Sequence, residues 1–431
     1  MIGFFKKLFL FAFYNSIKVI INVTKYLYYS RITTKREGLP DNAVFIVVSN
    51  HPNALMDPYL VAAALPFQVF FLANASLFVK GFARWFFSTF FCIPIARKVD
   101  NNAMGVKNDE SFQKCIEHFA SGGHLYIAPE GGSIAQRKLQ SIKSGTARIA
   151  ISTLEQHPEI PLHILPVGVN YEASTRFRKK LRLNFGAPIC VKQFVEQYHN
   201  ESVDITRLLT SHIEVKMKEQ IIIADTKRTD NILKIWEKVA YQYHFMNNSN
   251  WFEQCKKWSD MILGDKVQHH LLSNSQSFYK LTRVTGVEKL STKNMLFYVL
   301  GLVIGLPFFL YGFANHFFAW AIIEILIRKI KPDICYLSTF KYLGGLLFVP
   351  IFYCIQFLFI RDINADWGYC YLLSVVPLGL FAWSYFQYFQ VFIEKLKWSR
   401  IKNDRIGKAM LKLEKEIIDF CRITAIGHTP R

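Results

Sequence analysis

Short apolar runs rich in β-branched and aromatic residues alternate with amphipathic stretches between residues 40 and 190. These runs predict five strands, over Val44–Ser49, Val69–Leu72, Leu125–Ala128, Ile164–Val167 and Leu181–Phe185. Helical periodicity over Asp109–Ala120 and Gly145–Gln156 separates some of them. Strands that alternate with helices predict an α/β domain, with a mostly parallel sheet flanked by helices.

A different pattern begins at Met295, where long apolar runs replace the alternation. There are four such runs, over Met295–Phe313, Phe317–Ile327, Leu343–Ile360 and Tyr369–Phe392. A helix needs about 20 residues to cross the hydrocarbon core, so the second run must borrow residues from its neighbours. With a turn at Ala314–His316, the runs predict two helical hairpins, or about four C-terminal transmembrane helices. The flanking basic residues would then fall on one side of the membrane, as the positive-inside tendency expects.

The N-terminal stretch is apolar but is interrupted by Lys18 and Lys25. No small-residue cleavage site follows it, which argues against a signal peptide. We expect a retained helix that lies in the membrane face, with a full span as the alternative.

These patterns divide the chain into five parts. They are an N-terminal membrane-associated helix (1–35), the α/β domain (36–200), a helical extension of unassigned role (201–290), the transmembrane region (291–393) and a cytoplasmic tail (394–431).

Composition and charge agree with a membrane protein. Of the 431 residues, 51% are hydrophobic and 39 are Phe, while the formal net charge is +20. Such an excess of bases suits the cytoplasmic side of a membrane with anionic headgroups. Nucleic-acid binding is the competing interpretation, but the bases are dispersed and no nucleic-acid module is recognisable. The eight cysteines form no C-x-x-C pair, so neither a disulfide framework nor a metal site is predicted.

Candidate chemistry begins with His51 and Asp57, which follow the first predicted strand. A hydroxyl attacks an acyl group well when a base removes its proton, and histidine is the usual base at neutral pH. A carboxylate on the other ring nitrogen would fix the tautomer. No G-x-S-x-G motif is present, so the attacking hydroxyl would belong to the substrate. The alternative is a capping aspartate beside a turn histidine.

A second cluster, Glu130–Ser133, follows the strand at Leu125–Ala128. Its glycines expose backbone N–H groups that suit an anion, and Glu130 could accept hydrogen bonds from a polyol. The alternative is a tight turn in which glycine permits positive φ. Arg97 could pair with a phosphate, or could be half of an ordinary solvated pair with Lys98. Pro166 is most simply a structural residue at a strand edge.

In this order the four patches resemble the phospholipid/glycerol acyltransferase (PlsC-like) family. The motifs read Asn50-His51 to Asp57, Ile93-Pro94 to Arg97, Ala128-Pro129-Glu130-Gly131-Gly132-Ser133, and Leu165-Pro166-Val167. One departure is that five residues, rather than four, separate His51 from Asp57. This spacing and the Glu-Gly-Gly-Ser block look like the branch of glycerol-3-phosphate and dihydroxyacetone-phosphate acyltransferases.

The resemblance implies a role for each matched residue. It implies that His51 is the general base and Asp57 its orienting partner, and that Arg97 contacts the acceptor phosphate. It further implies that the acceptor is bound by Glu130, Gly131, Gly132 and Ser133, and that Pro166 belongs to the block linked to the acyl donor. No metal or bound cofactor is implied, since the thioester of coenzyme A or acyl carrier protein is a co-substrate.

The predicted function is transfer of a fatty acyl group to the sn-1 hydroxyl of glycerol 3-phosphate at a lipid bilayer. Acylation of lysophosphatidate or another lysophospholipid is the alternative within the class. A non-catalytic lipid-binding membrane protein is the alternative outside it, and a transporter is disfavoured because no internal repeat is visible. We expect the catalytic domain on the cytoplasmic face, in a bacterial inner membrane rather than the endoplasmic reticulum.

Overall fold

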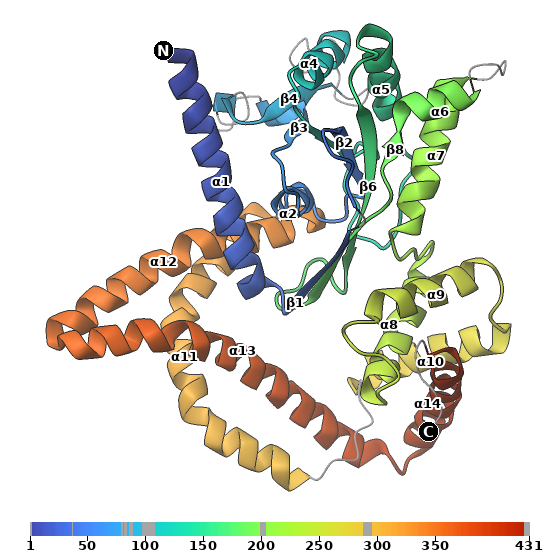
Figure 1. Ribbon diagram of the computed structural model, residues 1–431. Helices are drawn as coiled ribbons and strands as arrows, with labels where there is room; N and C mark the ends of the chain where they lie inside the picture. The colour runs from blue at the N-terminus through green and yellow to red at the C-terminus, as the bar shows by residue number, and fades with distance from the viewer. Residues whose placement is uncertain are drawn as a thin grey trace. The chain divides into compact units, whose positions relative to one another are not determined.

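The computed structural model describes residues 2–36, 38–78, 81, 84–85, 89–96, 108–198, 204–287 and 295–425 (Figure 1). By its internal contacts the chain forms two compact units. The first unit comprises Met1–Ile223 together with the short segment Asp333–Thr339. The second unit comprises Ala224–Pro332 and Phe340–Arg431.

Within the described residues, the first unit is built on an eight-stranded sheet. The strands are β1 (Arg31–Arg36), β2 (Val44–Ser49), β3 (Phe70–Asn74), β4 (Cys92–Ile95), β5 (Leu125–Ile127), β6 (Leu162–Tyr171), β7 (Lys180–Phe185) and β8 (Ile189–Cys190). Their order is β1-β7-β6-β2-β5-β3-β4, with β8 also paired to β6. All pairs are parallel except β6–β7 and β6–β8. This confirms the mostly parallel sheet and the five strands predicted from the apolar runs.

The two outermost strands, β1 and β4, were not among the predicted ones. β1 reads Arg-Ile-Thr-Thr-Lys-Arg and is largely exposed, because it pairs only with β7. β4 is short and contains Pro94, a residue that sheets tolerate at their edges. An edge strand buries little surface, so β1 lacks the apolar run by which a central strand is recognised. β4 is apolar, but it is only four residues long and contains a proline.

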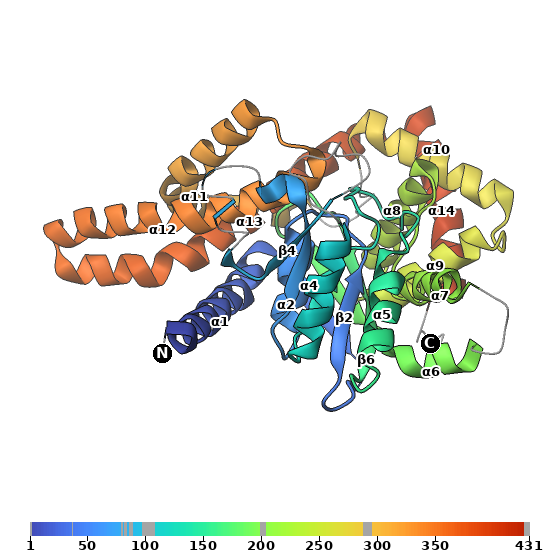
Figure 2. The same ribbon diagram turned by 90° about the horizontal axis from the view of Figure 1, so that it is seen from above.

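Helices cover both faces of this sheet. They are α1 (Ile2–Tyr28), α2 (Met56–Ala64), α4 (Asn108–Ala120), α5 (Gly145–Gln156), α6 (Val191–Tyr198) and α7 (Ile205–Glu219). One core joins Ile46 of β2 to Phe119 of α4, Ile149 of α5 and Met217 of α7. Figure 2 shows α4 and α5 side by side over the sheet. α2 contacts β6, and α1 packs on α2.

Two polar residues of α1, Lys18 and Asn22, point toward the end of α2. Lys18 Nζ donates a hydrogen bond to the Leu65 carbonyl, and Asn22 Nδ2 donates to the Ala63 carbonyl at 3.2 Å. These carbonyls end α2, where a helix lacks internal donors and favours a cation. The outward face carries exposed apolar side chains, among them Phe5, Phe9, Phe11, Val19 and Val23. Lys18 therefore does not interrupt the apolar surface of α1, although it interrupts the apolar sequence.

The second unit contains a bundle of amphipathic helices. These are α8 (Lys227–Gln242), α9 (Trp251–Leu263), α10 (His269–Thr285) and α14 (Arg405–Thr424). Trp236 and Trp258 are fully buried and meet edge to face, with ring centroids 5.8 Å apart. Their indole N–H groups donate to Ser275 Oγ at 2.9 Å and to Thr424 Oγ1 at 2.8 Å. Such pairing lets large amphipathic rings fill a core without leaving a buried donor unsatisfied.

An ionisable group inside this bundle makes its stability depend on pH. Glu414 is 4% exposed, and it accepts long hydrogen bonds from Gln242 (3.5 Å) and Tyr243 (3.4 Å). Burial raises the pKa of Glu414 from 4.5 to about 7. The folded state therefore holds this proton more tightly than the unfolded state. Its contribution is fully present below pH 4.5 and is lost as the pH rises toward 7.

Replacing Glu414 by Gln should remove this dependence, because the amide keeps the shape and carries no charge. At pH 8 we expect Glu414→Gln to be more stable than wild type by up to about 3 kcal/mol, and at pH 4 to be indistinguishable. Thermal unfolding of the full-length protein in detergent, at several pH values, measures the difference. If the wild type and Glu414→Gln had equal stabilities at pH 8, burial of the charged Glu414 side chain would not destabilise the fold, contrary to this prediction.

Three long apolar helices make up the rest of the second unit. They are α11 (Met295–Ile330), α12 (Leu337–Ile363) and α13 (Ala365–Ile401). The predicted turn at Ala314–His316 is wrong, because α11 runs through it without a break. Asn315 Nδ2 donates to the Tyr311 carbonyl, and His316 Nδ1 bonds the Gly312 carbonyl, so both polar side chains bond back onto their own helix. The short second run is therefore the end of one helix and not a separate span.

The chain holds four helices that are long and apolar enough to cross a membrane, by length and composition, within its described residues. They cover Leu8–Tyr28, Met295–Ile330, Ile334–Ile363 and Ala365–Ile401. Pro307, Pro350 and Pro377 lie inside the three C-terminal helices, where membrane helices tolerate proline. α11 and α13 approach closely at Gly312, where an added Cβ would lie 2.2 Å from the Leu378 carbonyl oxygen. Small residues at helix contacts are typical of membrane bundles, and the long apolar helices indicate membrane association.

Candidate functional site

His51 and Asp57 face each other across the loop between β2 and α2. His51 Nδ1 lies 3.0 Å from Asp57 Oδ2, and the carboxylate is completely buried whereas the histidine side chain is 18% exposed. The five intervening residues fit because Ala54 adopts a positive φ of 37°, a conformation that is rare outside glycine. The extra residue relative to the family motif is thus absorbed in the loop, and the two side chains still meet.

Asp57 is held by more than the imidazole. Its Oδ2 also accepts the Asn53 N–H at 2.7 Å, and its Oδ1 accepts the Tyr171 hydroxyl at 2.6 Å. Burial is the main reason that the pKa of Tyr171 lies well above its ordinary range, so the phenol stays a donor. Tyr171 ends β6, 114 positions from Asp57, and nothing in the sequence singled it out.

The loop that carries His51 is fastened to the neighbouring strand. Asn50 accepts the Val169 N–H at 2.7 Å and donates to the Val169 carbonyl at 3.0 Å. Asn53 Nδ2 donates to the Ser174 carbonyl at 3.0 Å. After β2 ends, these side-chain amides bond backbone groups that the strand no longer pairs. The bonds fix the loop and therefore the position of His51.

Glu130 lies beneath His51 and contacts backbone. Its side chain is 5% exposed, with Oε1 accepting the His51 N–H at 2.9 Å and Oε2 accepting the Gln140 N–H at 3.0 Å. Burial raises the pKa of Glu130, and the two backbone donors oppose that effect. The carboxylate therefore joins three segments around the site, and it is not among the residues that line the cavity. This geometry fits a positioning residue better than the acceptor contact implied by the family motif.

Glu130→Gln should separate these two roles. An amide offers one acceptor oxygen, so either the His51 or the Gln140 N–H would face an NH₂ group. We expect the free energy of unfolding to fall by about 2 kcal/mol. Misplacement of His51 should also lower kcat for the acyl transfer that the sequence predicts, by up to about a hundredfold. Thermal melting and steady-state kinetics measure both, with the exposed Glu155→Gln as the control. A changed acceptor KM with unchanged kcat and stability would instead support direct substrate binding.

Gly131, Gly132 and Ser133 line the cavity beside His51. Gly131 has a φ of +71°, and an added Cβ would lie 2.6 Å from Lys143 Nζ. The Ile134 N–H donates to the His51 carbonyl at 3.2 Å. The glycine-rich loop is thus fixed to the histidine loop, with its open side toward the cavity.

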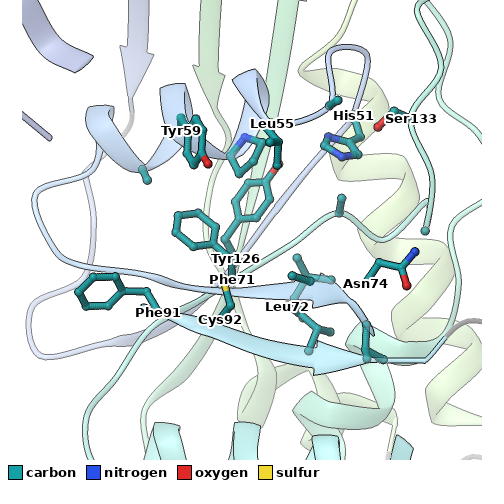
Figure 3. Close-up of a pocket in the computed structure, with 18 of the residues that line it drawn as sticks. His51, Leu55, Tyr59, Phe71, Leu72, Asn74, Phe91, Cys92, Tyr126 and Ser133 are labelled. Carbon is teal, nitrogen blue, oxygen red and sulfur yellow. The ribbon is translucent and has the colours of Figure 1, made fainter. Parts of the chain in front are cut away.

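The cavity has a volume of about 1000 Å³, at the upper end of the range of roughly 300–1000 Å³ usual for ligand sites. Figure 3 shows His51 and Ser133 at one end, and Tyr59, Phe71 and Phe91 toward the other. Apolar side chains from α1 also line it, including Phe13 and Ile17. One cavity therefore combines a polar end that carries the histidine with a long apolar region.

Part of the cavity wall comes from the segment Asp333–Thr339, which lies in sequence where α11 gives way to α12. Asp333, Cys335 and Tyr336 line the cavity, and Ser338 Oγ donates to the Ser174 carbonyl at 2.5 Å. This segment belongs to the first unit by its contacts. Sequence patterns had placed the whole region among the membrane helices, so its part in the site was missed.

Asp57 and Glu130 lie behind His51 and do not line the cavity, and two further predicted site residues are not placed on its wall by the described structure. Arg97 lies outside the described residues. Pro166 is buried in β6, an interior strand rather than an edge, and it does not line the cavity. Its carbonyl accepts the Gly186 N–H at the gap between β7 and β8. A proline fits there because its missing N–H would point to that same gap.

The remaining side chains offer little for metal chemistry. No cluster of three His, Cys, Asp or Glu side chains that could hold a metal occurs among the described residues. The eight cysteines are free thiols.

Comparison with known proteins places this site in context. The Acyltransferase family matches residues 31–170. Glycerol-3-phosphate O-acyltransferases 1 and 2 of Saccharomyces cerevisiae are each 34% identical, over 106 and 86 residues, which is 24% and 20% of this chain. The chain spans only 13% and 12% of the length of these relatives.

Among solved structures, a 1-acyl-sn-glycerophosphate (LPA) acyltransferase, PlsC, from Thermotoga maritima aligns with a TM-score of 0.36. It is 20% identical, and the alignment covers 48% of this chain and 77% of that one. The matched family region includes the His51–Asp57 pair, the glycine-rich loop and most of the sheet that positions them. Residues 31–170 of this chain are therefore an acyltransferase-family domain, as the ordered motifs predicted.

Proposed function

We propose that this protein is a membrane glycerolipid acyltransferase that transfers a fatty acyl group from an acyl thioester to the sn-1 hydroxyl of glycerol 3-phosphate. The observation that carries the proposal is the His51–Asp57 pair, 3.0 Å apart, at the polar end of a cavity whose other end is apolar. An acyltransferase-family domain supplies the reaction class. The partial likeness to two glycerol-3-phosphate O-acyltransferases favours the acceptor.

In the proposed reaction His51 acts as the general base. Asp57 holds Nδ1, and none of the described residues bonds Nε2. As the acceptor oxygen attacks the thioester carbonyl carbon, its proton moves to Nε2 and the buried carboxylate stabilises the imidazolium. The tetrahedral intermediate then collapses with cleavage of the C–S bond. The leaving thiolate takes the proton from His51, which gives an ester, a free thiol and the original base.

The apolar part of the cavity would hold the acyl chain. Phe13 and Ile17 come from α1, whose outer face is also apolar, so a chain drawn from a bilayer would pass over similar side chains. The donor in this proposal is acyl-CoA or acyl carrier protein. The basic net charge supports a position of the catalytic domain on the cytoplasmic face of its membrane. In this proposal that membrane is a bacterial inner membrane.

The acceptor is tested by direct comparison. Purified full-length protein in lipid micelles receives labelled acyl-CoA, or acyl carrier protein, with glycerol 3-phosphate, dihydroxyacetone phosphate or lysophosphatidate in parallel. We expect the highest kcat/KM with glycerol 3-phosphate, and a 1-acyl product. A preference for lysophosphatidate would overturn the assignment of glycerol 3-phosphate as the acceptor, but it would leave the proposed acyl-transfer reaction in place. No transfer to any acceptor would favour a non-catalytic lipid-binding protein.

A further inference from the structure

The amino end of α5 opens into the same cavity as His51. Ser144, Gly145 and Thr146 all line the cavity, and the first helical bond runs from the Arg148 N–H to the Ser144 carbonyl at 2.9 Å. The N–H groups of residues 145 to 147 precede that bond, and Ser144 does not cap them with its side chain. Free N–H groups and the helix dipole make such an end attractive to an anion.

Thr146 supplies a second, independent sign of a ligand. Its side chain is 2% exposed and lines the cavity, and its Oγ1 has no hydrogen-bond partner among the described residues. Thr153, two turns later in α5, shows the usual solution, since its Oγ1 donates to the Ile149 carbonyl at 2.7 Å. Buried hydroxyls are normally paired, so the unpaired one at the cavity indicates a place for a bound acceptor atom.

Lys143 brings a positive charge to the same place. Its N–H donates to the Pro129 carbonyl at 2.9 Å, and its Nζ lies against Gly131. Arg148, one turn into α5, also lines the cavity, with its guanidinium 5.1 Å from the Phe112 ring centroid. Among the described residues that line the cavity, Asp333 is the acidic one, and its carboxylate accepts the Cys335 N–H at 2.8 Å. The balance of charge at this end is therefore positive.

We propose that Lys143, Thr146 and the free N–H groups of α5 form the site that binds the phosphate monoester of the acceptor. This inference rests on the proposed function and assigns the phosphate to described residues that the sequence motifs had not singled out. Lys143 would contribute charge, Thr146 a hydroxyl donor, and α5 its backbone donors. The glycine loop between Lys143 and His51 would then place the acceptor hydroxyl near the base.

The test measures binding apart from turnover. Equilibrium dialysis of labelled glycerol 3-phosphate against full-length protein in detergent, without donor, gives the Kd for wild type, Lys143→Gln and Thr146→Val. We expect Kd to rise about tenfold or more for Lys143→Gln and severalfold for Thr146→Val, because charge-assisted hydrogen bonds are the stronger ones. Inorganic phosphate should displace the label from wild type.

Two matched variants serve as controls. Lys138→Gln removes an exposed lysine that does not line the cavity, and Thr153→Val removes a buried hydroxyl that already has a partner. Both should bind glycerol 3-phosphate as wild type does. Melting temperatures of all four variants separate loss of the site from loss of the fold.

Steady-state kinetics identify which phosphate occupies the site, since coenzyme A also carries phosphates. A raised KM for glycerol 3-phosphate with an unchanged donor KM supports the proposal, and the reverse overturns it. Unchanged Kd values in both variants overturn it as well, even if wild type acylates glycerol 3-phosphate. If wild type transfers no acyl group yet binds glycerol 3-phosphate through Lys143, the anion site stands and the proposed function falls.

Discussion

His51→Ala is expected to lower kcat for acyl transfer by a factor of about 10² to 10⁴, the usual contribution of a positioned general base. The imidazole of His51 lines the cavity, and its Nδ1 is bonded to the buried carboxylate of Asp57. Its Nε2 is therefore available to accept a proton. Without it, the acceptor hydroxyl must lose its proton to water as the ester bond forms. The measurement is the rate of labelled ester formation at saturating acceptor and donor.

The control for this variant is His157→Ala. His157 is partly exposed and pairs with Glu159 at 3.2 Å, and it does not line the cavity. Its removal should leave kcat unchanged, since a surface ion pair contributes little. Near-normal turnover in His51→Ala, with a normal melting temperature, would remove His51 from the mechanism and with it the proposed reaction.

Asp57→Asn is expected to cost as much as about 10⁴ in kcat, as the equivalent change does in the serine-protease triad. Asp57 accepts three hydrogen bonds, from His51, Asn53 and Tyr171. An asparagine has one acceptor oxygen, and its NH₂ group would face at least one of these donors. If it faces His51, Nδ1 must accept and Nε2 must carry the proton, so the imidazole can no longer act as a base.

Tyr171→Phe provides a graded comparison for Asp57→Asn. It removes one of the three donors and leaves the carboxylate charged, so we expect a loss of about tenfold. The surface variant Asp260→Asn, which breaks an exposed ion pair with Lys256, should leave kcat unchanged. The order of kcat should therefore be wild type, Tyr171→Phe, then Asp57→Asn. An Asp57→Asn enzyme more active than Tyr171→Phe would show that the carboxylate does not orient the base.

The central strands could be predicted because burial on both faces leaves an apolar run in the sequence. β2 begins and ends where its run does, and the loops after β2 and β5 carry the polar clusters. Contacts between distant segments leave no such pattern. Tyr171 and the Asn50–Val169 bonds depend on β6 lying beside β2, and no local spacing reveals that pairing.

The membrane region shows the opposite difficulty. Hydropathy located the apolar residues of α11 but not its continuity, because Asn315 and His316 look like turn residues in a sequence. In the helix their side chains bond the carbonyls four residues back, which an isolated pattern of polar and apolar positions cannot distinguish from a turn. Lys18 is a similar case. Its side chain points toward α2 because it bonds the carbonyl at the end of that helix, a contact that the sequence of α1 alone does not show.

The cavity wall supplied by Asp333–Thr339 bears on how a water-soluble version of the enzyme should be engineered. A fragment trimmed at Ile223 retains His51, Asp57 and the whole sheet, yet it discards Asp333, Cys335 and Tyr336. The cavity would lose part of its wall, and in the proposed reaction this would expose the thioester to bulk water. The cavity wall and the long apolar helix α12 thus share one stretch of this polypeptide, so a shortened version should have Asp333–Thr339 grafted back through a linker.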